Sequence, residues 1–401
     1  MIRSAVRVAG GVLAGLVVIF IASLAVSPYF RRWALLNLPD VYDYSKLPSR
    51  TVPRSVQPFR FPDCTAGDWI SPLKLAYSHQ SIADEAALGR FLAEHGTTAF
   101  IAVKDGCLLD ERYFNGFRRD SLFKSFSVTK SVVSALIGAA IADGWIGGID
   151  DPVTKYIPEM QDPRFTRVTL RHLLDNTAGI NYERGNMPWT SQPRMYYTTD
   201  VRGYVRGVGI DVEPGVRFST EDMSPIILGW ALERALRRHP AAPTLSGYLA
   251  ERIWQPIGAE YDAMWIVDRE HGGLEKGESG LTARAIDLAK FAALYLQQGR
   301  WNSRQVIPAA WVSESTSVNS DPPGPNVWSS GFFKHQWWGR KVPAPAPSDF
   351  YANGHFGQRL YVSPRNQLIL VRMGDSNRGI DWADFLAVVA DAFVLGPKTG
   401  E

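Results

Sequence analysis

Cysteine is scarce in this sequence of 401 residues, which has only Cys64 and Cys107. Two thiols exclude a protein held together by many disulfides and a metal site built from several thiolates, although spacing alone leaves open whether the two form one bridge. An excess of charge of one sign is also missing, because 43 Lys and Arg residues face 40 Asp and Glu residues and no dense basic block occurs. The sequence therefore gives no electrostatic basis for binding nucleic acid.

Several motifs of catalysis and cofactor binding are missing as well. The chain has no H-E-x-x-H and no pair of histidines at helical ligand spacing, so a zinc hydrolase has no starting point. It has no G-x-S-x-G, the elbow of α/β-hydrolases, and no G-x-x-x-x-G-K-[ST] loop for phosphate. We therefore expect neither a metal nor a cofactor.

The amino terminus carries a long uncharged run. From Val8 to Phe30 no residue is charged, and these 23 positions would form roughly 34 Å of helix, enough to cross a bilayer core. A cleavable signal peptide usually has a shorter apolar region and a small-residue cleavage site, which Ala25-Val26-Ser27 matches poorly. We therefore expect residues 1–32 to be a retained transmembrane signal anchor, with cleavage as the alternative.

Four arginines bracket this run, namely Arg3, Arg7, Arg31 and Arg32. Two on each side leave the positive-inside rule undecided. From the usual behaviour of signal anchors, we expect the bulk of the chain on the extracytoplasmic side of a membrane, which in a bacterium is the inner membrane.

The rest of the chain divides into two parts. Residues 33–79 are rich in proline, which prevents long helices, so we expect a linker and packing arm. Residues 80–397 are expected to form one folded domain. The overall composition, 45% hydrophobic and 21% charged, is typical of a folded protein and excludes disorder, collagen and a coiled coil.

Strands are predicted near both ends of this domain, with helices between them. Thr97–Val103 and Cys107–Phe114 are apolar, β-branched or aromatic runs around a Lys-Asp-Gly turn, which predicts a hairpin. Arg359–Val362 and Leu368–Met373 predict late strands, and an apolar helix runs from Val128 to about Asp143. This order predicts an α+β fold, with an antiparallel sheet built from both chain ends, flanked by helices, and a mostly helical inserted region.

One catalytic pattern is present, Ser-x-x-Lys, in which a serine and a lysine one helical turn apart face the same side and the amine can accept the hydroxyl proton. It occurs three times, at Ser71/Lys74, Ser121/Lys124 and Ser127/Lys130. Only the last pair stands at the head of the apolar helix, where the first turn favours negative charge and apolar surroundings favour a neutral amine. The alternative is that this serine only caps the helix and the lysine reaches the surface.

An ordered set of motifs surrounds this pair, from about Glu111 to Gly374. The motifs are Glu111–Gly116, Ser127–Ser131, Asp151–Tyr156, Leu170–Leu174, Thr177–Ile180, Pro214-Gly215 with Phe218, Leu228–Trp230, Gly299–Trp301 and Gly354–Gln358. Each is common alone, but the ordered set resembles the serine β-lactamase and penicillin-binding-protein superfamily, and within it the esterase and 6-aminohexanoate-dimer hydrolase branch. The resemblance implies a β-lactamase-like fold.

The resemblance also implies roles for particular residues. Ser127 would be the acylated nucleophile and Lys130 its base. His355-Phe356-Gly357 takes the place of the family's K-T-G or H-x-G strand motif and would border the substrate cleft, where Gly357 would let substrate approach the backbone. The backbone N–H groups of Ser127 and Gln358 would form the oxyanion hole.

One part of the family pattern is absent. Where the family has Tyr-x-Asn or Tyr-x-Ser after a Pro-Gly turn, this chain has Thr220-Glu221-Asp222, still expected in the cleft. Thr220 has no phenolate form and cannot relay protons as tyrosine does, while Asp222 could pair with Lys130 and keep its amine charged. Three explanations stay open: Lys130 works alone, most turnover has been lost, or another tyrosine reaches the site. The candidates are Tyr182, Tyr196 and Tyr197.

We therefore expect a membrane-anchored serine hydrolase without a cofactor, which cleaves a small amide or ester through a covalent acyl-enzyme. Its partners would be a small-molecule substrate and, through the amino-terminal helix, a membrane, while the oligomeric state stays open. The alternative is a catalytically weak or inactive protein of the same fold with a binding or regulatory role. The departure at Thr220 is the main support for that alternative.

Overall fold

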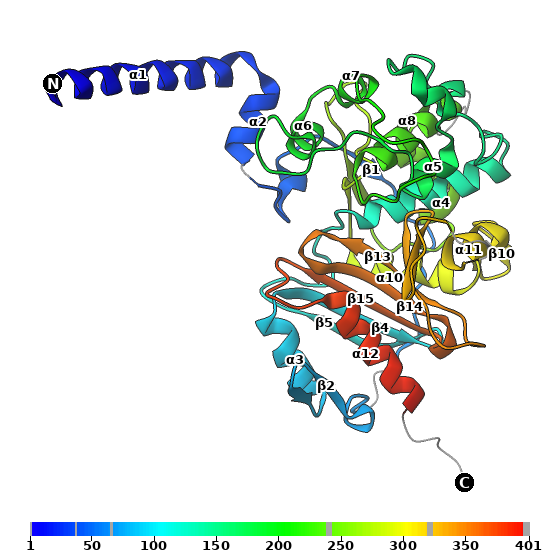
Figure 1. Cartoon of the computed structure of the whole chain (residues 1–401). Coiled ribbons are helices and arrows are strands. Elements are labelled where there is room, and N and C mark those ends of the chain that lie inside the picture. Colours follow the sequence, from blue (N-terminus) through cyan, green and yellow to red (C-terminus); the bar gives the residue numbers. More distant parts are fainter. Residues whose placement is uncertain (1, 37, 65–66, 238–242, 319–323, 396–401) are drawn as a thin grey trace, which may run out of the picture.

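The structure, a computed structural model, describes residues 2–36, 38–64, 67–237, 243–318 and 324–395, so the last two residues of the domain expected at 80–397 lie outside it. Its centre is a seven-stranded antiparallel sheet in the order β11-β12-β13-β14-β15-β4-β5 (Figure 1). The strands are β4 (Thr97–Lys104), β5 (Cys107–Tyr113), β11 (Gly331–Lys334), β12 (Trp337–Arg340), β13 (Asp349–Gly354), β14 (Gln358–Ser363) and β15 (Leu368–Gly374). The prediction of a sheet built from both chain ends is confirmed.

Strand β4 is buried on both faces of the central sheet, which explains its continuous apolar run Ala99–Val103. Ile101 and Val103 point into the core shared with the helical region, whereas Phe100 and Ala102 point to the opposite face. That opposite face is covered by α3 (Glu85–Glu94) and α12 (Trp382–Leu395), as Figure 1 shows.

The region between β5 and β11 is mostly helical, as predicted. Its helices are α4 (Val128–Ala142), α5 (Leu170–Leu174), α6 (Ser191–Tyr197), α7 (Val201–Arg206), α8 (Met223–Leu236), α9 (Leu245–Leu249) with the π-helical turn Ala250–Trp254, α10 (Ala285–Leu296) and α11 (Ala309–Thr316). The apolar helix predicted from Val128 is α4, which is buried around almost its whole circumference. The chain also has two short hairpins, β2 (Leu75–Tyr77) with β3 (Gln80–Ile82) and β9 (Arg300–Trp301) with β10 (Arg304–Gln305).

The amino-terminal run forms two helices instead of the single helix expected from Val8 to Phe30. These are α1 (Ile2–Val26) and α2 (Pro28–Leu36). The break lies at Ser27, whose Oγ accepts a hydrogen bond from Phe30 N at 3.2 Å, because a serine cap followed by proline is a strong signal for a new helix. Within the described residues, no single helix is long and apolar enough to cross a membrane, and Gly11–Val26 with α2 meets that test only as a pair bent by 111°.

The Pro-rich segment at 33–79, expected to be a linker and packing arm, contributes a strand to a sheet. Its strand β1 (Ser49–Val52) starts a second sheet in the order β1-β7-β8-β6. The partner strands are β7 (Ala263–Ile266), β8 (Leu281–Ala283) and β6 (Phe123–Lys124). The spacing of Cys64 and Cys107 in the sequence could not decide whether they pair. In the structure they form a disulfide that joins the arm to β5.

Candidate active site

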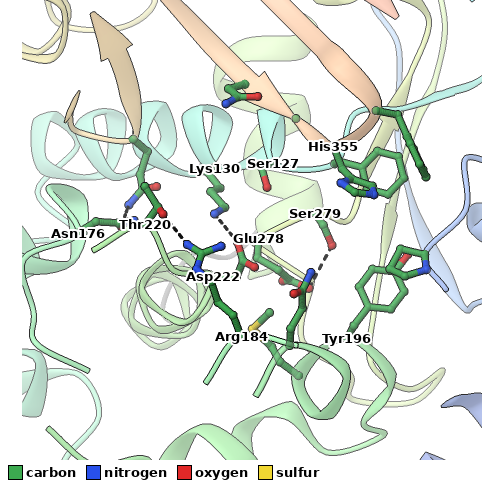
Figure 2. A pocket seen from close by; sticks show the side chains of 18 of the residues that line it. Ser127, Lys130, Asn176, Arg184, Tyr196, Thr220, Asp222, Glu278, Ser279 and His355 are labelled. Carbon is green, nitrogen blue, oxygen red and sulfur yellow. Dashed lines mark hydrogen bonds and ion pairs between the residues drawn. The ribbon is translucent and has the colours of Figure 1, made fainter. Parts of the chain in front are cut away.

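A cavity of about 700 Å³ opens where the head of α4 meets the end of β13. Its charged lining residues are Lys130, Arg184, Asp222, Glu278 and Arg359, and its aromatic ones are Phe126, Tyr196, Phe333, Trp338 and Phe356. Figure 2 shows Ser127 and Lys130 leaving the same helix toward this space, with Asp222 facing Lys130 and with His355 and Tyr196 farther along the cavity. The structure thus brings most of the predicted site residues together.

Ser127 stands at the N-cap position of α4, yet among the described residues its hydroxyl makes no capping hydrogen bond. The head of the helix is held by its neighbours: Ser125 Oγ donates to Leu281 O at 2.7 Å, and Thr129 Oγ1 accepts from Leu281 N at 3.1 Å. Phe126, just before the serine, has φ +48°, a conformation that costs a non-glycine residue roughly 1–3 kcal/mol and is common at active sites. The serine hydroxyl is therefore left available for chemistry.

Lys130 points inward and does not reach the surface, because only 13% of its side chain is exposed. Its amine donates to Asp222 Oδ1 at 2.5 Å and to Glu221 O at 3.1 Å. Within the described chain, no hydrogen bond joins this amine to Ser127 Oγ. The resting lysine is thus engaged in an ion pair beside the nucleophile.

Asp222 is ionised in this arrangement. Its burial disfavours the carboxylate, but the charge of Lys130 and the hydrogen bonds from Lys130 and Tyr182 outweigh burial and hold the pKa of Asp222 below its usual value. The pairing of Asp222 with Lys130, considered from the sequence, is therefore present.

Of the three tyrosines considered, Tyr182 reaches the charged pair. Its hydroxyl donates to Asp222 Oδ2 at 2.9 Å. Burial, then the charge of Asp222, raises the pKa of Tyr182, so the phenol stays protonated at neutral pH. Tyr196 lines the cavity, but its hydroxyl donates to Asp43 Oδ2 at 2.6 Å, and Tyr197 is buried beside it.

The segment that replaces the family's tyrosine triplet is firmly held. Glu221 accepts hydrogen bonds from the backbone N–H groups of Met223 and Ser224, at the start of α8. Burial raises the pKa of Glu221, against the effect of these bonds. Thr220 lines the cavity, where its Oγ1 accepts a hydrogen bond from Arg184. Among the described residues, no hydrogen bond joins the threonine hydroxyl to Lys130.

On the strand side, His355 and Phe356 line the cavity as expected. Their rings lie 5.6 and 5.5 Å from the ring of Phe126. Partial burial in this aromatic wall lowers the pKa of His355, although the charge of Asp222 acts in the opposite sense. The imidazole is therefore neutral at pH 7.

Gly357 and Gln358 differ from expectation. Gly357 has φ +78°, and a Cβ there would lie 2.4 Å from Trp382 Cδ1, so packing behind the strand, not substrate approach, requires glycine. The N–H of Gln358, expected in the oxyanion hole, donates to His355 O and closes the turn His355–Gly357. The Gln358 side chain pairs with Gly374 through Nε2 to O at 2.6 Å and Oε1 from N at 2.8 Å. Gln358 does not line the cavity among the described residues.

Several cavity residues were not anticipated from the sequence. Glu278 is 2% exposed, and burial raises the pKa of its carboxyl, whose Oε1 accepts a hydrogen bond from Ser279 Oγ at 3.1 Å. Its only sequence signal is a polar Gly-Glu-Ser-Gly run ahead of an apolar segment. Leu38 and Pro39, from the arm, also line the cavity and carry no local signal of it.

Known hydrolases are similar to this chain in sequence. The 6-aminohexanoate-dimer hydrolase of Paenarthrobacter ureafaciens is 26% identical over 303 residues, which cover 70% of this chain and 73% of that protein. An esterase of Burkholderia gladioli is 33% identical over 96 residues, covering 23% of this chain and 24% of the esterase.

Solved structures share the fold. A Bacillus anthracis protein described as a 6-aminohexanoate-dimer hydrolase superposes with a TM-score of 0.74 at 22% identity and covers 91% of this chain and 93% of its own. A class C β-lactamase superposes with a TM-score of 0.58 at 12% identity, covering 78% and 95% of the two chains. The fold predicted from the motifs is confirmed. Because the beta-lactamase family model matches residues 87–384, this chain belongs to the beta-lactamase family and is a serine hydrolase.

Proposed function

We propose that this chain hydrolyses a small linear amide or ester through an acyl-enzyme on Ser127. The observation that carries the proposal is the uncapped Ser127 hydroxyl at the head of α4, inside the cavity and beside Lys130. Relatives described as a 6-aminohexanoate-dimer hydrolase and an esterase support this choice of bond.

In the acylation step, Ser127 Oγ attacks the carbonyl carbon and its proton passes to the amine of Lys130. The same proton then goes to the leaving nitrogen or oxygen as its bond to carbon breaks. A water molecule repeats the sequence on the acyl-enzyme, which releases the acid and restores the serine. The head of α4 favours the negative charge that develops on the carbonyl oxygen.

Lys130 must lose a proton before it can accept one. Transfer from Lys130 to Asp222 inside the pair gives a neutral amine and a neutral acid, and displacement of water by substrate favours this form because a dry site disfavours separated charges. Tyr182 holds the carboxylate in place by its hydrogen bond to the other oxygen. In this proposal Asp222, held by Tyr182, accepts and returns the proton that the family tyrosine would relay.

A second oxyanion donor follows from the same mechanism. The N–H of Gln358 becomes available only if the turn His355–Gly357 opens and releases its bond to His355 O. Phe356, at the centre of this turn, has φ +57°, so the turn is already under local strain. We propose that substrate binding opens it.

We also propose that residues 1–32 anchor the chain in a membrane, which in a bacterium is the inner membrane, with the hydrolase domain on the extracytoplasmic side, although among the described residues only α1 and α2 together meet the test for a span. The large apolar side chains of α1 between Val12 and Ile21 are 45–65% exposed, which suits an apolar environment better than water. The Cys64–Cys107 disulfide suits an oxidising compartment. Protease treatment of intact spheroplasts tests this, because an extracytoplasmic domain is digested and a cytoplasmic one is protected.

Active-site labelling tests the chemistry. We expect a serine-directed fluorophosphonate to modify the purified protein at Ser127, as located by mass spectrometry, and to leave Ser127→Ala unmodified. Ser121→Ala is the matched control, since Ser121 belongs to another Ser-x-x-Lys pair and should not affect labelling. Absence of labelling in the parent would support the alternative, a binding or regulatory protein, which the Lys130–Asp222 ion pair favours.

A further inference from the structure

Two exposed apolar side chains of the hydrolase domain lie beside the end of α1. The chain bends at Ser27, and just after the bend Tyr29 Oη donates a hydrogen bond to Pro188 O at 2.5 Å. On either side of this proline in the sequence, Met187 is 51% exposed and Trp189 is 62% exposed. These two side chains, called the Met187/Trp189 patch below, are therefore held close to the point where α1 ends.

The loop that carries the patch is fixed to α2. Besides the bond from Tyr29, Trp33 Nε1 donates to Asn186 O at 3.1 Å. Arg32, on the same helix, donates to Thr198 O at 3.4 Å and to Asp268 O at 2.7 Å. Figure 1 shows α2 packed beside α6, with α1 leading away from the domain. The patch thus keeps a fixed place next to the bend.

The bend itself carries the residue types found where a helix leaves a membrane. Arg31 donates to two carbonyl oxygens in the last turn of α1, at 3.0 and 3.1 Å, so its charge lies at the carboxyl end of that helix. The ring of Phe30 packs against the rings of Phe20 and Trp33, at 5.5 and 5.3 Å. Arginine and aromatic side chains gather at the boundary between hydrocarbon and water. This boundary is therefore expected at the bend, where the patch also lies.

One kind of partner covers the patch and α1 together. Single exposed apolar side chains are ordinary, but Met187 and Trp189 are two positions apart, and Val26, the last residue of α1, is 83% exposed at the same bend. A protein partner on the patch would leave the exposed side chains of α1 in water. A bilayer buries both, so the position of the patch favours a lipid surface.

We propose that Met187 and Trp189 insert into the interface of a phospholipid bilayer and form a second membrane contact, on the hydrolase domain itself. The inference rests on the proposed membrane location, with α1 in the same bilayer. Tryptophan suits this place because its ring is apolar and its N–H can reach the headgroups. The same loop supplies Arg184 and Asn186 to the main cavity, so this contact holds one wall of the cavity at the membrane surface.

Site-specific fluorescence tests this in the full-length protein, reconstituted into vesicles of phosphatidylcholine and phosphatidylglycerol. Because Cys64 and Cys107 are the chain's only cysteines and form a disulfide, an introduced cysteine is the single free thiol for a nitrobenzoxadiazole label. Lipids with a nitroxide on the headgroup or the acyl chain then quench labels that touch the bilayer. We expect about threefold quenching at Met187→Cys, which keeps Trp189 in place.

Val394 gives the matched control positions. It is 52% exposed on α12, which Figure 1 shows on the far side of the central sheet from α2. A label at Val394→Cys should stay unquenched. In the protein labelled at Met187→Cys, Trp189→Glu should restore most of the lost fluorescence, whereas Val394→Glu adds the same charge on α12 and should restore none. Equal effects of the two glutamate variants would overturn the proposal.

A label at Val17→Cys in α1 reports the anchor separately. Quenching there without quenching at Met187→Cys would refute the second contact and leave the proposed location intact. Quenching at Met187→Cys alone would support the contact and refute only the anchor, and quenching at neither position would refute both. If the Met187→Cys label shifts to the blue without being quenched, a protein such as a second copy covers the patch and the lipid contact is refuted.

Discussion

Two lysines that follow a serine by three residues, Lys130 and Lys124, lie in contrasting surroundings. Lys130 projects from α4 into the cavity and pairs with Asp222 at 2.5 Å. Lys124, in β6, is 2% exposed, donates to Ser279 O at 3.2 Å and lies 4.8 Å from the ring centre of Phe126. Burial lowers the pKa of Lys124 to about 8. This lowered pKa would by itself make Lys124 a candidate for a general base.

The position of the neighbouring serine favours Lys130, and not Lys124, as the base. Ser121 precedes β6 outside any helix, and its Oγ accepts a hydrogen bond from Arg118 N at 2.9 Å. Ser127 and Lys130 instead share one face at the head of α4, because helical positions three apart lie on the same side. A lowered lysine pKa therefore does not identify a base unless a nucleophile lies beside it.

The largest expected effect separates the two serines. We expect Ser127→Ala to lower kcat/KM for an ester substrate by at least ~10³-fold, since the acyl-enzyme can no longer form. Ser121→Ala should remain within about twofold of the parent. Steady-state kinetics of both variants measure this, and a comparable loss in Ser121→Ala would break the assignment.

The next largest effect separates the two lysines. Lys130→Met should lower kcat/KM by roughly 10²–10⁴-fold, the usual range for a general base. Lys124→Met removes the more deeply buried amine and should change kcat/KM by no more than about threefold. The opposite ranking in the same kinetic assay would make Lys124 the base and refute the geometric argument.

Lys124 should instead govern stability at alkaline pH. Its folded pKa lies near 8 and its ordinary value is 10.5, so between these limits the unfolded chain binds more protons and folding stability rises with pH. The full gain is about 3 kcal/mol. Urea unfolding at pH 7.5 and pH 10 should show this rise in the parent and a smaller rise in Lys124→Met, because the pKa of the buried Lys276 is lowered as well. A rise of equal size in the variant would assign it to another group.

The contrast between local and distant contacts also explains what the sequence could predict. The strand expected at Thr97–Val103 is β4 with one added residue, because its long apolar run is a local signal. β1 was missed, since its four residues are recognisable only through pairing with β7, more than 200 positions later. Predictions succeeded where the pattern is periodic and failed where a distant partner decides.

The site shows the same division. Ser127 and Lys130 were predicted because helical spacing alone puts them on one face. The hydrogen bond from the Gln358 N–H to His355 O was not predicted. It depends on the left-handed backbone at Phe356, and no residue type in that position indicates this conformation. Leu38 joins the cavity from an arm whose docking depends on contacts with residues about 150 positions later, such as Trp33 with Asn186.

The smallest expected effect comes from Tyr182, whose hydroxyl contacts the carboxylate partner of Lys130. It tests whether Asp222 takes part in catalysis by Lys130. Tyr182→Phe removes the hydrogen bond to Asp222, so the pKa of this carboxyl should rise toward its ordinary value. Because Asp222 must be ionised to take the proton of Lys130, the acidic limb of the kcat/KM profile should move to higher pH. Because the ordinary pKa of the carboxyl is 3.8, we expect the loss of kcat/KM to be about twofold near pH 4 and to be absent at pH 7. Tyr204→Phe, in a partly buried tyrosine that stacks on Arg194, is the control and should leave the profile in place. A uniform loss at all pH values would mean that Tyr182 supports packing only and that Asp222 does not receive the proton.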